Sequence, residues 1–325
     1  MTSRMWRRGW TDPGRRLRYH SERVLVSALV PVMDTALLSA ATSVAIRAEQ
    51  LAQHALRSGA RSRPAAGRPL VHWHEGGTGS PLLLLNGWTA SGLVWPASVL
   101  NRLERRFHVL RVDARGTGWS RGAPMPFTIA DLADDAVAVL RASGHEQAIV
   151  AGLSMGGMVA QEIAMRHPET VTRLILLATR PPVPAHIGSP KSLFALATAA
   201  PPADQRLDDY LRALWAGFAA PGFAEAHPEV IDEIVAAVLA RTTTRAGLFN
   251  QARAAVAWHG SGRLRDVGAP TVVVHGDRDG LIPVDNGVRL GGLIPTARYV
   301  ELPGVGHLIP FEAADTFTQI IEDAR

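Results

Sequence analysis

The stretch IVAGLSMGGMVAQE, residues 149–162, joins an apolar run to a helix-compatible run through a turn crowded with glycine. Residues 148–151 have the composition of a buried strand, and residues 158–166 can continue as a helix. Gly152 and Gly156 permit a turn so tight that a side chain at either position would clash, and Ser154 occupies its apex. The turn is either structural or presents Ser154 as a nucleophile, and its place between a strand and a helix favours the nucleophile.

Short apolar runs alternate with helical segments on both sides of this turn. The predicted strands are residues 71–75, 82–85, 107–112, 148–151, 174–178, 271–274 and 299–302, and the predicted helices are residues 129–142, 158–167 and 315–323. Residues 82–85 are all leucine, as expected for a strand that is covered on both faces. The alternation predicts an α/β fold with a mostly parallel central sheet and helices on both faces.

The glycine-rich residues 76–80 lead from the first predicted strand into the second. A phosphate-binding loop is excluded, because the Gly-Lys-Ser/Thr ending is missing and a strand, not a helix, follows. We therefore expect a hairpin connection between these two strands.

Residues 181–262 separate two predicted strands by too long an interval for a simple crossover. The segment has a helical pattern with large apolar side chains on one face: Tyr210, Leu211, Leu214, Trp215 and Phe218. The expected domain organisation is an α/β core of residues 69–180 and 263–325, with residues 181–262 inserted as a helical cap.

The N-terminal residues 1–68 form a basic arm of different composition. Residues 1–70 contain twelve arginines and four acidic residues, a net charge of +8, although the whole chain carries only +5. Residues 24–56 have an apolar stripe with helical spacing, and residues 59–68 read as a linker. Three interpretations stay open: an amphipathic helix packed on the protein itself or on a second copy, which we favour; a helix lying on a membrane surface; and a membrane span or signal anchor, which Asp34 disfavours.

The composition limits the chemistry. A chain of 325 residues with 47% hydrophobic residues can bury one large core with an insertion. No cysteine is present, which excludes disulfides, cysteine-ligated metals and thiol catalysis. No nucleic-acid-binding motif accompanies the basic arm, so we expect no nucleic-acid partner. The expected localisation is cytoplasmic, with the arm as a candidate for peripheral membrane contact or self-association.

A serine nucleophile needs a base, and His307 is the preferred candidate among twelve histidines. It follows the last predicted strand in a loop that Gly304 and Gly306 make adaptable. His72 and His74 lie in an early strand, where they are surface or core residues. The remaining candidates are His167 at a helix end, His275 at a strand end, where it could be structural, and His259, the reserve candidate for the base.

The base in turn needs a carboxylate that orients it, and the sequence VVVHGDRDGLIP offers Asp277 and Asp279. We choose Asp279, because it lies two residues farther from the strand end, in a turn with Gly280, while Asp277 is expected to cap that turn. The order Ser154, Asp279, His307 is that of one particular fold. For the oxyanion, the expected donors are the backbone N–H groups of Met155 and Trp88, since Gly87 lets the backbone approach closely.

With these motifs, the chain from about residue 69 to residue 325 resembles the α/β-hydrolase fold superfamily. The matching motifs are Asn86-Gly87-Trp88, Asp113-Ala114-Arg115-Gly116-Thr117-Gly118-Trp119-Ser120, Gly152-Leu153-Ser154-Met155-Gly156-Gly157, Gly276-Asp277-Arg278-Asp279 and Gly304-Val305-Gly306-His307. The chain departs from many relatives at Asn86 and Thr117, where those have histidine. Asparagine before the glycine resembles a subset that includes enol-lactonases and polyester depolymerases. The resemblance does not extend to residues 1–68.

The resemblance and the residues together predict a serine hydrolase that cleaves carboxylic esters through an acyl-enzyme. Lactone, thioester, amide or carbon–carbon bond hydrolysis, acyl transfer and cofactor-free perhydrolysis would use the same residues. Haloalkane dehalogenase and epoxide hydrolase activities are disfavoured, because they need a carboxylate where Ser154 stands. The alternative of another class is a catalytically silent ligand-binding module, which the intact set of three residues argues against.

Four residues are expected near an apolar substrate pocket: Asn86, Trp215, Phe218 and Trp258. No histidine–carboxylate cluster in the sequence has metal-ligand spacing. We therefore expect neither a metal nor a cofactor, and a small apolar ester as the binding partner.

Overall fold

The computed structural model describes residues 70–188 and 204–324. The predicted arm, its helix 24–56 and part of the predicted cap lie outside the described residues. The strands are β1 Trp73–Gly76, β2 Ser80–Leu85, β3 Phe107–Val112, β4 Ala148–Leu153, β5 Val171–Leu177, β6 Thr271–Gly276 and β7 Ala297–Leu302. The α-helices are α2 Ala97–Leu103, α3 Ile129–Ala142, α4 Met155–Arg166, α6 Leu207–Ala216, α7 Phe223–Ala226, α8 Pro228–Ala240, α9 Arg245–Val256, α10 Asp285–Leu293, α11 Ile309–Glu312 and α12 Ala314–Glu322.

The seven strands form one sheet with the order β1-β3-β2-β4-β5-β6-β7. β1 runs antiparallel to β3, and each of the other neighbouring pairs is parallel. The predicted mostly parallel sheet is thereby confirmed. The site-bearing strand β4 lies between β2 and β5 and is buried at every position, as expected for a central strand covered on both faces.

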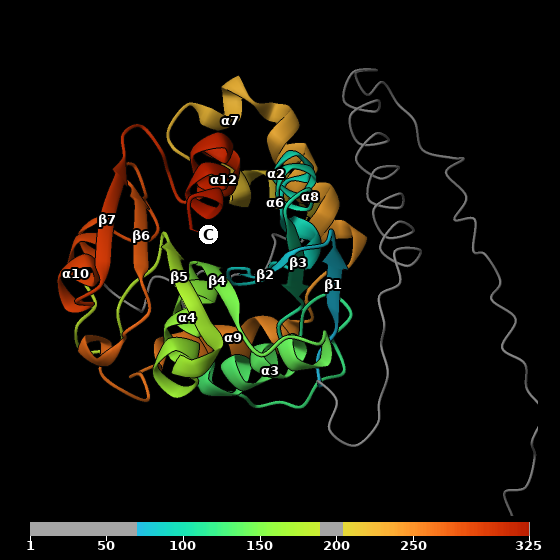
Figure 1. Ribbon diagram of the computed structural model, residues 1–325. Coiled ribbons are helices and arrows are strands. Elements are labelled where there is room, and N and C mark those ends of the chain that lie inside the picture. Colours follow the sequence, from blue (N-terminus) through green and yellow to red (C-terminus); the bar gives the residue numbers. More distant parts are fainter. Residues whose placement is uncertain (1–69, 189–203, 325) are drawn as a thin grey trace, which may run out of the picture. The chain divides into compact units, whose positions relative to one another are not determined.

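Helices cover both faces of this sheet (Figure 1). Alternate side chains of β2 enter two different cores, because successive residues of a strand point to opposite faces. Leu83 and Leu85 pack in a core with residues of α3, α4, α9 and α10, while Leu82 and Leu84 pack in a core with residues of α2 and α12. The predicted helices 129–142, 158–167 and 315–323 correspond to α3, α4 and α12.

The start of α3 shows how the local sequence defines a helix boundary. The side chain of Thr128 accepts a hydrogen bond from the backbone N–H of Asp131, and the Asp131 carboxylate accepts one from the N–H of Thr128. This reciprocal pair satisfies N–H groups that have no partner within the helix. The helix ends before Gly144, whose positive φ of 84° turns the chain toward β4.

The expected hairpin between the first two strands is wrong. β3 lies between β1 and β2 and pairs with both of them. The connection instead passes close to the backbone that enters β3: a Cβ on Gly77 would lie 2.3 Å from the carbonyl oxygen of Phe107, and one on Gly79 would lie 2.4 Å from that of Arg106. The glycines of residues 76–80 thus let this connection pass close to the backbone at the start of β3. They do not form a hairpin turn between β1 and β2.

The described part of residues 181–262 divides between two cores. Leu211 and Trp215 of α6 pack with residues of α8, with the short 3₁₀ helix Gly92–Val94 and with Leu308. Ala254 and Ala255 of α9 instead join the core beneath the sheet that holds α3 and α4 (Figure 1). On these contacts, α6 and α8 share one core and α9 packs with the main body, so the expected cap would consist of α6 and α8 and would not include α9.

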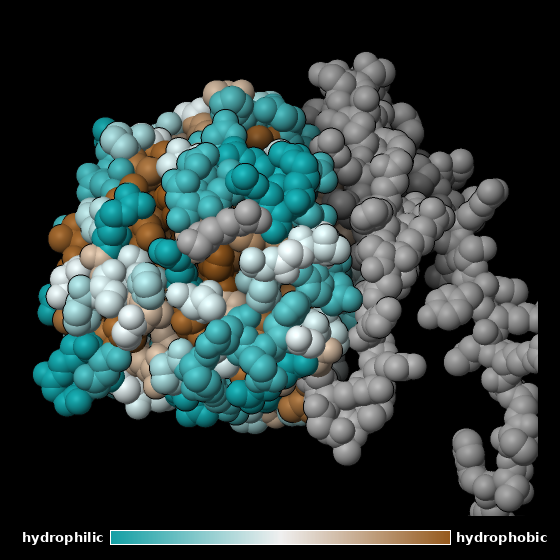
Figure 2. Space-filling model, viewed as in Figure 1, coloured by the Kyte–Doolittle hydropathy of each residue, from teal (hydrophilic) through white to brown (hydrophobic). Residues whose placement is uncertain are grey.

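No helix within residues 70–188 and 204–324 is long and apolar enough to cross a bilayer. On the face that Figure 2 shows, hydrophilic residues predominate and apolar residues form small patches between them. Among the described residues, the large hydrophobic side chains that are exposed are Leu70, Leu207, Phe249 and Val288.

Candidate active site

Ser154 connects the last residue of β4 to the first residue of α4 in a strained conformation. Its φ of 57° and ψ of −117° are rare for a residue with a side chain. The turn is possible because Gly152 and Gly156 have no side chains: a Cβ on Gly152 would lie 2.2 Å from the carbonyl oxygen of Gly156, and one on Gly156 would lie 2.1 Å from that of Leu85. Two hydrogen bonds connect the strained residue to β5 and the segment after it, from Ser154 N to Leu177 O (2.9 Å) and from Thr179 Oγ1 to Ser154 O (2.7 Å).

A cleft containing about 490 Å³ of empty space, part of it open to solvent, lies beside Ser154. Ser154 and His307 both line it, as do Asn86, Gly87 and Trp88 of the loop that follows β2. The remaining lining residues are apolar: Ala90, Val94, Leu153, Trp215, Phe218, Leu281, Leu308 and Phe311. The described part of the lining therefore offers polar side-chain groups from Asn86, Ser154, His307 and the indole N–H groups of Trp88 and Trp215, besides the backbone, and no charged carboxylate, ammonium or guanidinium group.

Asp279 and His307, predicted from the sequence as a pair, lie in direct contact. The distance from His307 Nδ1 to Asp279 Oδ2 is 2.8 Å. The other carboxylate oxygen, Oδ1, accepts hydrogen bonds from the N–H groups of Leu281 and Ile282, both at 2.9 Å. Because an ionised carboxylate only accepts, Nδ1 carries the proton and Nε2 of His307 is left as the basic nitrogen.

The environment of Asp279 keeps its carboxylate ionised. Burial alone would raise the pKa, but the charge of His307 and the donor groups of His275 and His307 outweigh burial and lower the pKa of Asp279 well below its ordinary value. The other candidate, Asp277, has a different partner, since its Oδ1 accepts the N–H of Gly304 at 2.7 Å. Asp277 thus ties the turn after β6 to the loop that carries His307.

Asp279 also has a second histidine beside it. His275, fully buried at the end of β6, places Nε2 3.3 Å from Asp279 Oδ2 and 3.0 Å from the carbonyl oxygen of Ile282. The sequence analysis noted a structural role as one option for His275 but not this contact. In the sequence, only the spacing of four residues between His275 and Asp279 indicated that the two side chains could meet across the turn.

Glu312, which the sequence analysis missed, holds the loop around His307. Its Oε2 accepts the N–H groups of Gly306 (2.8 Å) and Ala220 (2.9 Å), and its Oε1 accepts that of Leu308 (2.9 Å). The backbone N–H of His307 itself donates to Phe218 O at 2.9 Å. The loop is therefore anchored to the chain that leaves α6, and no sequence motif indicated this connection.

The loop after β2 approaches Ser154 at the predicted place. A Cβ on Gly87 would lie 3.3 Å from Ser154 Cβ, so only a glycine fits there without displacing its neighbour. Trp88 follows, with its indole Nε1 donating to Leu248 O at 3.1 Å. Met155 is the first residue of α4, and its N–H group has no acceptor within the helix. Both predicted oxyanion donors thus belong to segments that border Ser154.

The four expected pocket residues have different positions. Trp215 and Phe218 line the cleft. Asn86 also lines it, but its amide is engaged, donating from Nδ2 to Ser91 O at 2.7 Å. Trp258 does not line this cleft: its ring is buried in the core with α3 and α4, and its Nε1 donates to Glu162 Oε2 at 2.8 Å. Trp258 is thus a core residue, because its polar edge has a buried partner away from Ser154.

The expectation that no histidine and carboxylate groups have metal-ligand spacing is wrong. His72, His74 and Asp113 are all buried, and one possible ligand atom from each lies within 4.8 Å of the others. The sequence contained a signal in the spacing of the two histidines, because residues i and i+2 of a strand share one face. The sequence did not reveal that Asp113, the residue after β3, would lie beside both histidines.

The chain is similar to known proteins in both sequence and structure. The sequence model of the alpha/beta hydrolase fold family matches residues 80–314. A poly(3-hydroxyalkanoate) depolymerase of Ectopseudomonas oleovorans is 29% identical over 74% of this chain and 83% of its own length. A 2-hydroxymuconate semialdehyde hydrolase of a Pseudomonas species is 26% identical over 81% of this chain and 95% of its own length. Among solved structures, the enol-lactonase of Burkholderia xenovorans has a TM-score of 0.66, with 26% identity, and covers 80% of this chain and 99% of its own.

Proposed function

The chain belongs to the α/β-hydrolase fold family, and within that family we propose that it is a serine hydrolase that cleaves neutral carboxylic esters with an apolar acyl or alcohol group. The observation that carries this proposal is the combination, on one cleft, of a strained Ser154 and a His307 whose Nδ1 is bound to Asp279 at 2.8 Å. The chemistry that fits such a combination is nucleophilic acyl transfer.

In the proposed first step, Nε2 of His307 takes the proton of the Ser154 hydroxyl while Oγ attacks the acyl carbon of the ester. Asp279 keeps the imidazole in the tautomer that leaves Nε2 free and stabilises the imidazolium that forms. The negative charge on the former carbonyl oxygen is stabilised by the backbone N–H groups of Met155 and Trp88.

The tetrahedral intermediate then collapses. The bond to the alcohol breaks, and His307 gives its proton to the leaving oxygen, so the alcohol departs neutral and Ser154 remains acylated. A water molecule, deprotonated by His307, attacks the acyl carbon, and a second collapse releases the carboxylic acid and restores the Ser154 hydroxyl.

The character of the cleft supports a neutral, apolar substrate. Aromatic and aliphatic side chains, among them Trp215, Phe218 and Phe311, make up most of its described lining, and that lining contains no Asp, Glu, Lys or Arg. A charged group of a substrate would lose hydration there without gaining a counter-charge, which is costly. The relatives named as a polyester depolymerase and an enol-lactonase are in accord with ester and lactone substrates.

The test is hydrolysis of p-nitrophenyl esters, from acetate to long acyl chains, by the wild type and by the Ser154→Ala variant. Loss of the nucleophile is expected to lower kcat by about 10⁶. A simple aliphatic lactone and a p-nitrophenyl ester with a carboxylate at the end of the acyl chain complete the panel, and we expect the carboxylate-bearing ester to be the poorer substrate. Equal rates for wild type and Ser154→Ala would contradict the nucleophile and favour a ligand-binding role.

A further inference from the structure

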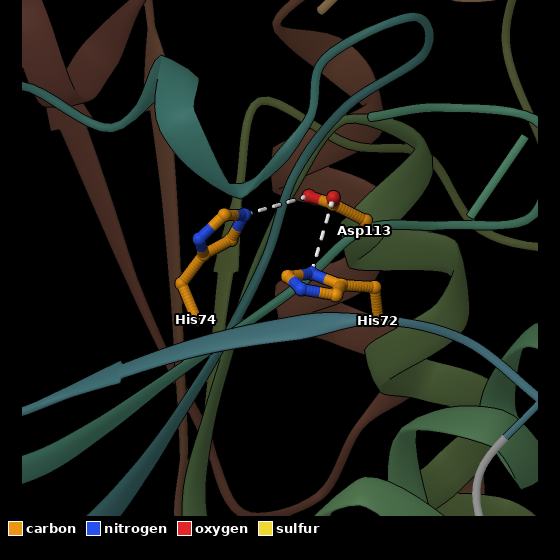
Figure 3. Close-up of side chains that lie close together, drawn as sticks. All are labelled: His72, His74 and Asp113. Carbon is orange, nitrogen blue, oxygen red and sulfur yellow. Dashed lines mark ion pairs between the residues drawn. The ribbon is translucent and has the colours of Figure 1, made fainter. Parts of the chain in front are cut away.

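His72, His74 and Asp113 form a buried group on the sheet, with none of its members among the residues that line the cleft of Ser154 (Figure 3). His74 lies in β1 and His72 just before it, so both imidazoles are on the same face of the chain. Asp113 follows β3, whose last residue, Val112, pairs with Trp73 between the two histidines. The antiparallel pairing of β1 with β3 therefore brings the carboxylate between the two rings.

The distances within this group are longer than those of the closest histidine–carboxylate hydrogen bonds in the structure. His72 Nδ1 lies 3.6 Å from Asp113 Oδ2, and His74 Nε2 lies 3.4 Å from Asp113 Oδ1. Elsewhere in the same structure, histidines that bind a carboxylate directly do so at 2.8 Å (His307 with Asp279) and 2.7 Å (His167 with Asp134). His72 Nδ1 and His74 Nε2 are buried and have no hydrogen-bond partner among the described residues.

These distances are close to the spacing of ligands around a tetrahedral metal ion, and a small shift of the carboxylate would bring one oxygen to both histidines. Zinc lies about 2.0–2.1 Å from histidine nitrogen and about 2.0–2.2 Å from carboxylate oxygen, which places two such ligands about 3.3–3.5 Å apart. Two imidazoles and one carboxylate are also a ligand set that zinc and similar transition metals prefer. We propose that His72 Nδ1, His74 Nε2 and the Asp113 carboxylate bind one divalent transition-metal ion of the zinc class.

The surrounding residues orient the carboxylate for this role. Asp113 Oδ1 accepts the N–H of Gly92 at 2.7 Å, and Oδ2 accepts the N–H of Trp119 at 2.8 Å, which leaves on each oxygen a further lone pair. Outer hydrogen bonds of this kind fix the orientation of metal ligands. Gly118 leaves room for the group, since a Cβ there would lie 2.2 Å from Asp113 Oδ2.

The indole of Trp119 packs against both imidazoles, at ring-centre distances of 5.5 Å from His72 and 5.3 Å from His74. The site would connect three segments: the edge strand β1, the loop 113–120 and, through Gly92, the loop that continues from Trp88. Because the ligand residues do not line the cleft, the ion would stabilise this edge of the sheet and would take no part in ester cleavage. The proposal is therefore independent of the proposed function.

The test uses full-length protein expressed in medium supplemented with Zn²⁺ or Co²⁺ and purified without chelators, with metal content measured by plasma mass spectrometry. The expected result is about one ion per chain, and for Co²⁺ the intense visible absorption of a tetrahedral site. The His74→Gln variant should lose the ion. The matched control is His145→Gln, which removes the partly buried contact between His108 Nδ1 and His145 Nε2 (2.7 Å) and should retain it.

A second measurement covers the case in which His74→Gln does not fold. Dialysis of the wild type against dipicolinate should lower its Tm, and Zn²⁺ but not Mg²⁺ should restore it. Purified wild type without stoichiometric metal and with a Tm that neither dipicolinate nor Zn²⁺ changes would overturn the proposal. So would equal metal content in the wild type and a folded His74→Gln variant, since the ion would then be bound elsewhere.

Discussion

Among the described residues, the three non-glycine residues with positive φ are Thr89, Ser154 and Ala178. Each follows the carboxyl end of a strand in the middle of the sheet, β2, β4 and β5 respectively. Such conformations cost about 1–3 kcal/mol each and persist only where the surroundings enforce them. Their positions after the carboxyl ends of three adjacent strands agree with the sequence-based choice of Ser154, and they identify the ends of β2 and β5 as parts of the same strained edge of the sheet.

The two aspartates after β6 provide a matched pair of variants. Asp279→Asn should lower kcat by about 10⁴, because an amide in place of the carboxylate favours the wrong imidazole tautomer. Asp277→Asn should change kcat only a few-fold, since the Asp277 carboxylate binds the N–H of Gly304 and not His307. Steady-state hydrolysis of the best p-nitrophenyl ester measures both, and a larger loss in Asp277→Asn would contradict the assignment.

The lowered pKa of Asp279 also makes stability depend on pH. Between this lowered pKa and the ordinary value of 3.8, the unfolded chain binds the proton and the folded chain does not. The stabilisation is therefore present in full above about pH 5 and is lost as the pH falls through about 4 and below. Urea unfolding at a series of pH values from about 5 to below 3.8 gives the slope of the free energy of unfolding against pH. This slope should be smaller in Asp279→Asn than in wild type, by up to about 1.4 kcal/mol per pH unit at the lowest pH values. Identical slopes would show that Asp279 has an ordinary pKa in the folded protein.

At the scale of elements, the loop that carries His307 depends on Glu312 and on the chain that leaves α6. Replacing Glu312 by Gln puts an amide N–H group where backbone N–H groups of Gly306, Ala220 or Leu308 now donate, so the loop should shift. A displacement of about 1 Å can cost about 10² in rate, so we expect a fall of this order in kcat with a smaller change in KM.

The matched control for Glu312→Gln is Glu301→Gln, an exposed residue of β7 that accepts a hydrogen bond from Tyr299. The kcat of the Glu301→Gln variant should stay within a few-fold of the wild-type value. If Glu312→Gln unfolds at the same urea concentration as wild type and also keeps full kcat, Glu312 does not position His307.

The turn between β4 and α4 can be tested with glycine variants. A Cβ on Gly156 would meet the carbonyl oxygens of Leu85 (2.1 Å) and Asn86 (2.6 Å), which are backbone atoms of β2 and its loop and cannot rotate away. Gly156→Ala should therefore lower the free energy of unfolding by about 1–3 kcal/mol and reduce activity by displacing Ser154. Gly268→Ala should have little effect, because a Cβ there meets no atom within 4 Å. Urea unfolding of both variants measures the difference, and equal effects would contradict a tightly packed turn.

At the scale of the whole molecule, the fold could be predicted because strand runs and helical runs alternate in the sequence with a clear change of period. β3 and α3 have the predicted bounds, whereas β4 and α4 extend to within one residue of Ser154 because Leu153 and Met155 continue their hydrogen bonding. The placement of β1 could not be predicted, because strand order depends on contacts between distant residues. The glycines of residues 76–80 indicated a turn but not which strand would lie beside it.

The candidate site was predictable where motifs carry it and not elsewhere. Ser154, Asp279 and His307 follow strand ends in recognisable turns, so the parallel sheet brings them to one edge. Glu312, the contact of His275 with Asp279, and the group of His72, His74 and Asp113 depend on side-chain packing between elements, which local sequence does not encode. Trp258 was assigned to the pocket from its residue type alone, and its buried partner Glu162 accounts for its position in the core.

The most direct test of the central claim is covalent labelling of the full-length protein by a fluorophosphonate, with the modified residue identified by intact mass and peptide mass spectrometry. An activated serine in this cleft should take up about one probe per chain, mapped to Ser154, and His307→Ala should label far more slowly at equal protein concentration. No labelling of the wild type, with a known serine hydrolase labelled in the same reaction, would contradict the claim. So would labelling at another residue, or labelling of Ser154 that does not depend on His307.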